Sequence, residues 1–167
     1  DLTPDCIYGW WEEQLLAESG YRGERKADGL RQQQGDDGVN QLLAAVDPSH
    51  LKWLTSLQFG FIELDCALIH GSSMNVGDQL TEDTSPLILM DRLTRMDVNR
   101  LFTARSRRQF RLELTGGELH SHVIDPAGET NQEQAVPKRS VIGIGGYCFY
   151  TVYDPATDYL EFLTAGE

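Results

Sequence analysis

The sequence predicts a mixed α/β fold in which helices come first and a mixed, largely antiparallel sheet follows. Apolar residues recur at helical spacing near the start of the chain, whereas from Phe59 onward short apolar runs alternate with turn residues, as in strands and hairpins. The 167 residues are 40% hydrophobic and 24% charged, which is an ordinary composition for one globular domain. We therefore expect a single domain over residues 1–167.

Three helices are expected in the first third of the chain. Thr3 and Pro4 are a typical N-cap and first helical residue, and the segment that they begin has apolar side chains at helical spacing. These apolar positions are Ile7, Trp10, Trp11 and Leu15. A short helix is expected over residues 39–46, and Asp47 with Pro48 begins a third. We interpret the tryptophans of these helices as core or interface anchors.

Two loops are expected. Residues 21–38 are polar and rich in glycine, and they contain too few apolar side chains to bury much surface, so we predict a mobile loop there. Residues 125–139 are also polar and contain two prolines, which predicts a second loop on the surface.

The strands are expected in the remaining part of the chain. Residues 59–69 alternate at first and then become continuously apolar, which predicts one strand entering a covered sheet. Residues 84–96 return to helical spacing. Two hairpins follow, because a Gly-Gly pair favours one tight turn and an Asp-Pro pair favours another. Their paired strands are 108–114 with 118–124 and 147–153 with 159–164.

The charge balance excludes some classes of partner. Lys and Arg number 14 against 26 Asp and Glu, giving a formal net charge of -12, whereas nucleic acids and anionic membranes require clustered cations. We expect neither as a partner, and no apolar run approaches the roughly 20 residues that span a bilayer. Cys6, Cys66 and Cys148 are odd in number and widely spaced, which favours a reducing, cytoplasmic location. The sequence does not begin with Met, so we expect it to start inside a longer gene product.

Several segments occur in an order that resembles a known family. A Trp-Leu-x-x-Leu segment at residues 53–57 precedes a strand that ends in His-Gly-Ser at residues 70–72, a turn over 137–143 comes later, and a hairpin closes the chain. In this order they resemble the C-terminal part of the calcineurin-like metallophosphoesterases, particularly small bacterial and cyanobacterial members. The resemblance implies a four-layer α/β/β/α sandwich, of which this chain supplies a part. It also implies hydrolysis of phosphoric esters with two divalent metals of the Mn, Fe or Zn type.

The metal ligands that the resemblance implies are missing here. The family's Gly-His-Ser-His motif corresponds to Ala104-Arg105-Ser106-Arg107, and a guanidinium has no lone pair to give to a metal. The family's N-terminal ligands have no counterpart, so only His70 remains, as a vestigial ligand, and one histidine cannot hold two ions. We expect no catalytic residue and no metal cofactor in this chain alone. The first hypothesis is therefore a catalytically inactive metallophosphoesterase-like protein, a pseudoenzyme kept for a binding or structural role.

Two alternatives remain open. In the first alternative, the chain is a fragment or subunit of an active metal-dependent phosphoric ester hydrolase. The sequence therefore leaves open whether the chain belongs to an enzyme. Alternatively, it is an anion-binding module in which Arg105 and Arg107 lie on one side of an extended segment, Arg111 is in phase with them, and Arg139 comes from a neighbouring turn. Such a cluster of arginines fits a phosphate-type anion. The competing interpretation is that these arginines form structural ion pairs with the chain's many carboxylates.

A partial sandwich also leaves apolar surface and sheet edges uncovered. We therefore expect a protein partner or a homo-oligomer that covers the missing half. Two further groups of side chains are of the types that bind metals, but we interpret both as side chains exposed to solvent. They are the pair His120 and His122, on one face of an expected strand, and the acidic loop with Asp78, Glu82 and Asp83.

Overall fold

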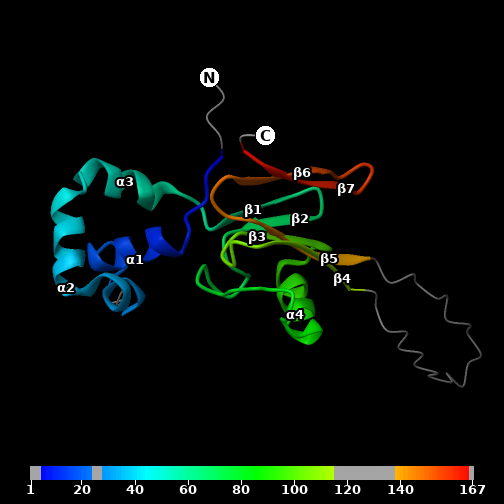
Figure 1. Ribbon diagram of the computed structural model, residues 1–167, viewed down its shortest axis with the longest axis horizontal. Helices are drawn as coiled ribbons and strands as arrows, with labels where there is room; N and C mark the ends of the chain where they lie inside the picture. Colours follow the sequence, from blue (N-terminus) through cyan, green and yellow to red (C-terminus); the bar gives the residue numbers. More distant parts are fainter. Residues whose placement is uncertain (1–4, 24–27, 115–137, 166–167) are drawn as a thin grey trace, which may run out of the picture.

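The computed structural model describes residues 5–23, 28–114 and 138–165, and these residues form four helices and seven strands. The helices are α1 (Trp10–Glu18), α2 (Asp28–Ala45), α3 (Pro48–Ser56) and α4 (Pro86–Met96). The strands are β1 (Gly60–Glu63), β2 (Cys66–Ile69), β3 (Arg100–Thr103), β4 (Gln109–Leu114), β5 (Arg139–Ile144), β6 (Phe149–Asp154) and β7 (Tyr159–Thr164). Figure 1 shows α1, α2 and α3 gathered beside the sheet and α4 against one of its faces.

The central sheet has five strands in the order β1-β2-β3-β5-β4. The inner strands β2, β3 and β5 are parallel to each other, and β1 and β4 run antiparallel to their neighbours at the two edges. The hairpin of β6 and β7 forms a second, two-stranded sheet over the face opposite α4 (Figure 1). This mixed α/β arrangement confirms the predicted fold class.

The central strands are buried on both faces because their side chains alternate between two cores. Leu101 of β3 and Val141 of β5 belong to a core that includes Leu93 of α4. On the other face, Phe102 of β3 packs in a core that the β6–β7 hairpin closes with Tyr153. The strand β3 is therefore held from both sides, and the loop that follows it starts from a fixed position.

The helix α1 begins at Trp10 rather than at the predicted Thr3. Thr3 and Pro4 lie outside the described residues. Ile7 forms an isolated parallel bridge with Gln58, so the segment before α1 is extended rather than helical. This bridge places the entry to the first helix beside the chain that leaves the third.

The predicted mobile loop over residues 21–38 is wrong in its larger part, because α2 occupies most of it. Leu30 and Val39 of α2 are buried against Ala17 of α1, and this small core stabilises a helix that its polar composition disfavours. Gly35 interrupts the helical geometry with a φ of 69°, which glycine adopts at little steric cost. Tertiary burial therefore overrides the local signal here.

Residues 59–69 form a hairpin rather than the single predicted strand. β1 and β2 pair antiparallel, and the chain reverses at Leu64 and Asp65, whose φ values are 48° and 65°. The Asp65 carboxylate accepts the backbone N–H of Asn99 at 2.9 Å and ties this turn to the start of β3. A contact between segments far apart in the sequence thus fixes a turn that the apolar pattern does not reveal.

The other local predictions have mixed outcomes. The helices α3 and α4 and the β6–β7 hairpin are confirmed, and the short helix expected over 39–46 is the C-terminal part of α2. Arg139 begins β5 instead of ending the predicted loop over 125–139, because it pairs with the end of β4. The rest of that loop and the strand expected over 118–124 lie outside the described residues.

Some apolar side chains stay exposed on the face of the β6–β7 hairpin that points away from the central sheet. They are Tyr150, Val152 and Tyr159. The expected partner or homo-oligomer stays a prediction. Within the described ranges, no helix has both the length and the apolar character needed to cross a membrane.

Candidate functional site

The loops that follow the parallel strands β2 and β3 meet at one edge of the sheet, where ligands bind in many open α/β sheets. The carbonyl oxygen of His70, just after β2, accepts the backbone N–H groups of Ala104 at 2.9 Å and Arg105 at 2.7 Å. The hydroxyl of Thr103 donates to the carbonyl oxygen of Gly71 at 2.7 Å. These bonds hold the two loops side by side and bring His70 and Arg105 together.

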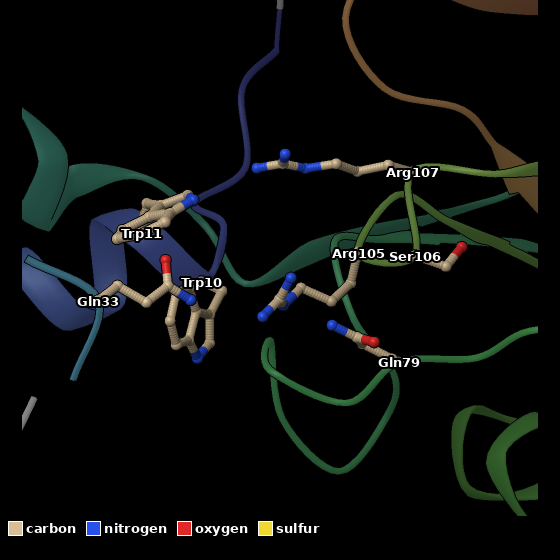
Figure 2. A pocket seen from close by; sticks show the side chains of 7 residues that line it. All are labelled: Trp10, Trp11, Gln33, Gln79, Arg105, Ser106 and Arg107. Atoms are coloured by element: carbon tan, nitrogen blue, oxygen red, sulfur yellow. The ribbon is translucent and has the colours of Figure 1, made fainter. Parts of the chain in front are cut away.

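A pocket of about 350 Å³ lies at this edge, between the loops of the sheet and the helices α1 and α2. Its lining side chains are Trp10, Trp11 and Gln33 on the helical side and Gln79, Arg105, Ser106 and Arg107 on the sheet side. Figure 2 shows that Arg105 and Arg107 extend from the sheet toward the two tryptophans. The pocket is therefore formed jointly by two layers of the fold.

Arg105 is held in place by the aromatic ring of Trp10. Its guanidinium carbon lies 4.5 Å from the centre of that ring, which is a favourable cation–π distance. The ring is itself confined, because a Cβ on Gly29 or Gly77 would lie under 3.0 Å from its atoms. Burial, and next the charge of Arg107, lower the pKa of Arg105. The Nε of Arg105 is buried and has no hydrogen-bond partner in the described part of the chain.

Neither arginine of the pocket forms an ion pair with an acid of the described ranges. Arg107 has a left-handed backbone conformation, with a φ of 59°, and its guanidinium carbon lies 5.2 Å from the centre of the Tyr147 ring. Among the described residues, no carboxylate oxygen lies within 4.0 Å of either guanidinium. The next residue, Arg108, does form an ion pair, with Glu82 at 3.2 Å. In a chain with 26 acidic residues, two neighbouring arginines thus have no acidic partner within the part that the structure describes.

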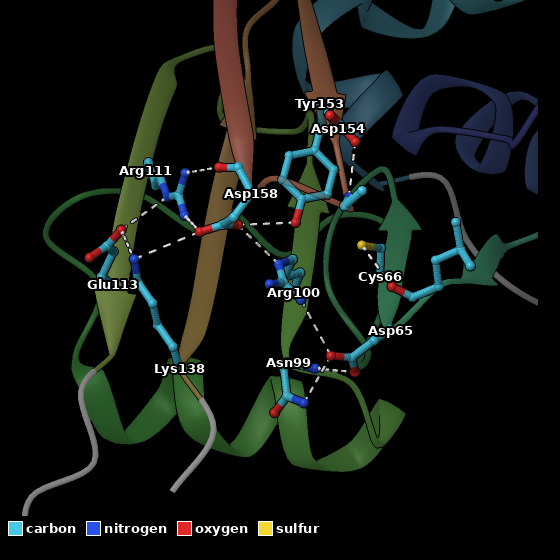
Figure 3. Close-up of polar contacts among 12 residues, drawn as sticks. Asp65, Cys66, Asn99, Arg100, Arg111, Glu113, Lys138, Tyr153, Asp154 and Asp158 are labelled. Carbon is cyan, nitrogen blue, oxygen red and sulfur yellow. Dashed lines mark hydrogen bonds and ion pairs between the residues drawn. The ribbon is translucent and has the colours of Figure 1, made fainter. Parts of the chain in front are cut away.

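Arg111 and Arg139 do not belong to this site, which corrects the predicted cluster of four arginines. Arg111 Nη2 donates to Asp158 Oδ2 at 2.5 Å (Figure 3), and Arg139 Nε donates to Asn99 Oδ1 at 3.3 Å. The expected common face does not exist because the chain turns at Arg107 before β4 begins. For Arg111, the structure shows ion pairs with Glu113 and Asp158, which are the contacts that the alternative interpretation of structural ion pairing expects.

His70 is partly buried beside the two pocket arginines. Burial lowers its pKa below the usual value, and the charges of Arg105 and Arg107 lower it further, while Glu12 acts in the opposite direction. Because its pKa lies below the ordinary 6.5, the imidazole is mostly neutral near pH 7. His70 therefore adds a polar group, and no positive charge, to this edge of the sheet.

The described residues do not fit a dinuclear metal centre. In the ranges that the structure describes, no three His, Cys, Asp or Glu side chains come close enough together to hold a metal ion. Asp78, from the acidic loop, is already engaged, because its carboxylate accepts the Ser72 hydroxyl at 2.5 Å and Arg92 Nε at 3.1 Å. His120 and His122 lie outside the described residues. The charged side chains beside His70 include the guanidinium groups of Arg105 and Arg107.

Sequence reasoning missed five side chains of the pocket: Trp10, Trp11, Gln33, Gln79 and Ser106. The prediction that the tryptophans act as anchors did not identify what they hold, which for Trp10 is Arg105. Gln33 falls in the segment predicted as a loop, and Gln79 lies in a connection without a distinctive pattern. No local signal could place these two amides, because only the packing of α2 beside the sheet brings them to one pocket.

Known proteins resemble this chain in fold rather than in sequence. It matches no protein-family profile, and no curated protein is significantly similar to it. A solved structure of a hypothetical protein from Pyrococcus horikoshii matches with a TM-score of 0.60 at 10% identity, covering 95% of this chain and 61% of that one. A metallophosphoesterase from Sphaerobacter thermophilus matches with a TM-score of 0.51 at 13% identity, covering 77% of this chain and 55% of that one.

At these identities the likeness shows the fold alone. The α/β fold of this chain is metallophosphoesterase-like, with a mixed five-stranded sheet and helices. The chain covers 61% and 55% of the lengths of the two proteins that it matches.

Proposed function

We propose that this protein binds a phosphate-type anion between Arg105 and Arg107 and does not hydrolyse phosphate esters, as a metallophosphoesterase-like fold kept for binding. The observation that carries the proposal is the pair of arginines without a carboxylate partner among the described residues, in a chain whose net charge is -12. Hydrogen bonds between guanidinium and phosphate are charge-assisted, and a guanidinium presents its donors in a fork that matches the phosphate oxygens.

The buried Nε of Arg105 adds a second argument. A buried donor without a partner costs about 1–3 kcal/mol, so an acceptor at this position would be stabilising. An oxyanion in the pocket supplies such an acceptor, and its negative charge also offsets the repulsion between the two guanidiniums. Because Trp10 already holds the Arg105 side chain, little conformational entropy is lost when the anion binds.

The first prediction concerns the affinity for inorganic phosphate. Isothermal titration calorimetry at low ionic strength should detect phosphate binding to the wild-type protein, with an affinity that falls as salt is added. Replacing Arg105 with Ala should weaken this binding by about tenfold or more, since a hydrogen bond to a charged group contributes about 1.5–3 kcal/mol. Arg107→Ala should weaken it as well.

Arg108→Ala is the matched control, because it removes one arginine from the same loop that is already paired with Glu82. We expect this variant to bind phosphate as the wild type does. Thermal unfolding of each variant checks that it is folded. An absence of phosphate binding to the wild type, or equal losses in Arg105→Ala and Arg108→Ala, would contradict the proposal.

The expected lack of hydrolysis follows from the chemistry of the same loops. Two catalytic divalent ions need several neutral imidazoles and carboxylates that converge on them. Here His70 is next to two guanidiniums, which repel a divalent cation. We therefore propose that the chain supports no phosphoesterase reaction of this type.

A second candidate function is supported by the partial coverage of the two solved structures, namely that this chain is part of a larger, active phosphoric ester hydrolase. The double variant Arg105→His, Arg107→His separates the candidates, because it restores imidazoles at the two positions. We expect neither the wild type nor the variant to hold two equivalents of Mn²⁺ or Zn²⁺ or to hydrolyse p-nitrophenyl phosphate. Stoichiometric metal with metal-dependent turnover, in either protein, would favour the hydrolase instead.

A further inference from the structure

The lining of the pocket is unusually polar for a small-molecule site. Five of its seven lining side chains carry amide, hydroxyl or guanidinium groups, whereas such pockets are usually lined mainly by apolar and aromatic residues. Its volume of about 350 Å³ lies near the lower end of the roughly 300–1,000 Å³ that is typical of ligand sites. The lining therefore suits a small charged ligand whose uncharged part is also polar.

The two amides stand on opposite sides of this pocket. Gln33 comes from α2 and Gln79 from the sheet side, and Figure 2 shows both side chains directed toward the pocket. Neither side-chain amide has a hydrogen-bond partner among the described residues. An amide offers two donors and one acceptor oxygen, so it pairs equally well with the donor and the acceptor of a hydroxyl. Two such amides around one anion site favour a ligand that carries several hydroxyl groups.

The aromatic rings of the pocket argue against a flat aromatic ligand. One face of Trp10 is taken by the guanidinium of Arg105, and its neighbour Trp11 meets it in a T-shaped contact with the ring centres 4.8 Å apart. Among the described side chains that line the pocket, no two parallel rings are placed to hold an aromatic ring between them. The remaining indole surface suits the carbon-bound hydrogens of a saturated ring.

From these observations we infer that the ligand is a phosphate monoester of a small sugar. The inference rests on the proposed anion site and specifies it further. Arg105 and Arg107 bind the phosphate group, Gln33 and Gln79 bind the hydroxyl groups, and the indole of Trp11 packs against the sugar ring. Because these groups come from both sides of the pocket, the ligand contacts the helices and the sheet together.

The inference is tested by comparing four probes by calorimetry: inorganic phosphate, glucose 6-phosphate, phenyl phosphate and glucose. We expect glucose 6-phosphate to bind about five- to tenfold more tightly than inorganic phosphate, because its hydroxyl groups form additional hydrogen bonds with the two amides. Phenyl phosphate should bind no more tightly than phosphate itself, and uncharged glucose should show no detectable binding. Arg105→Ala should weaken the binding of both phosphate and glucose 6-phosphate.

Variants of the two amides provide the residue-level test. Gln33→Ala and Gln79→Ala should each reduce the ratio of glucose 6-phosphate affinity to phosphate affinity by severalfold. Gln32→Ala, on the same helix but outside the pocket, should leave that ratio at the wild-type value. Gln33 is exposed on α2, so its replacement is compatible with folding, and the thermal unfolding midpoint verifies this.

The possible failures are distinguishable. If phosphate binds but glucose 6-phosphate binds no more tightly, or if phenyl phosphate is preferred, the sugar phosphate inference is overturned and the anion site stands. A preference for glucose 6-phosphate that survives both amide substitutions also overturns it. If neither phosphate nor glucose 6-phosphate binds, the proposed function fails together with the inference.

Discussion

Replacing Leu101 with Ala is expected to lower the free energy of unfolding by about 2–5 kcal/mol, which is a large part of the total stability of an ordinary domain. Leu101 is 0% exposed and lies in β3, the middle strand of the sheet. Its side chain packs in the same core as Leu93 of α4 and Val141 of β5. The substitution removes buried methyl groups and leaves a cavity that strands paired on both sides cannot easily close.

Urea denaturation monitored by circular dichroism measures this effect, with the slope of the transition kept as a check on two-state behaviour. The matched control is Leu87→Ala in α4, whose side chain is 81% exposed. It should change the stability by no more than about 0.5 kcal/mol. A loss below about 1 kcal/mol for Leu101→Ala would mean that β3 is not enclosed as the structure shows.

The second large effect is expected at Asp158, in the turn between β6 and β7. Its carboxylate accepts Arg111 Nη2 at 2.5 Å, the Tyr153 hydroxyl at 3.1 Å and Arg100 Nε at 3.3 Å (Figure 3). These partners lower the pKa of Asp158 to about 2 although burial opposes the shift. Asp158→Asn should destabilise the protein by about 1–2 kcal/mol near pH 7, a value reduced for the 30% exposure of the side chain. Asn is the suitable replacement because residue 158 has a φ of 56°, which Asn tolerates.

The pH dependence of this effect has a definite direction. The pKa of Asp158 is lower in the folded state than its ordinary value of 3.8, so the stabilisation is present above about pH 4 and is lost as the pH falls toward about 2. The difference in unfolding midpoint between the wild type and Asp158→Asn should therefore shrink between pH 5 and about pH 2. Asp37→Asn, at an exposed position of α2, removes one charge in the same way and is the control for the change in net charge. A difference in unfolding midpoint between the wild type and Asp158→Asn that stays constant over this pH range would contradict the assigned ion pairs.

The fold was predictable where local chemistry decides the structure. α3 starts at a proline that follows a capping Asp47, and the turn of the β6–β7 hairpin is set by Asp154, whose carboxylate accepts the backbone N–H of Ala156 and the hydroxyl of Thr157. The helix α2 was not predictable in this way, because the burial of Leu30 against α1 stabilises it. The reversal between β1 and β2 depends on a distant hydrogen bond to the start of β3, so no short window of sequence contains its cause.

The candidate site was predictable only in part, because contacts between segments far apart in the sequence decide the rest. His70 and Arg105 each follow an apolar strand, and strands that run parallel bring such residues to one edge. The grouping of Arg111 with Arg105 assumed an extended segment, and the turn at Arg107 removes that assumption. The amides of the pocket depend on how α2 packs beside the sheet, which the sequence of either segment alone does not specify.

The helices α1 and α2 share a small hydrophobic core that is separate from the core of the sheet and α4, and this has a consequence for local stability. Ala17, Leu30 and Val39 form one small cluster, which shares no buried member with the cluster that contains Leu101 and Val141. Proteins open locally in contiguous cooperative units, and a region with few buried apolar contacts opens at lower free energy than the main core. An anion held between Trp10 and the arginines of the sheet would contact both regions, so part of its binding free energy would protect α1 and α2 against local opening.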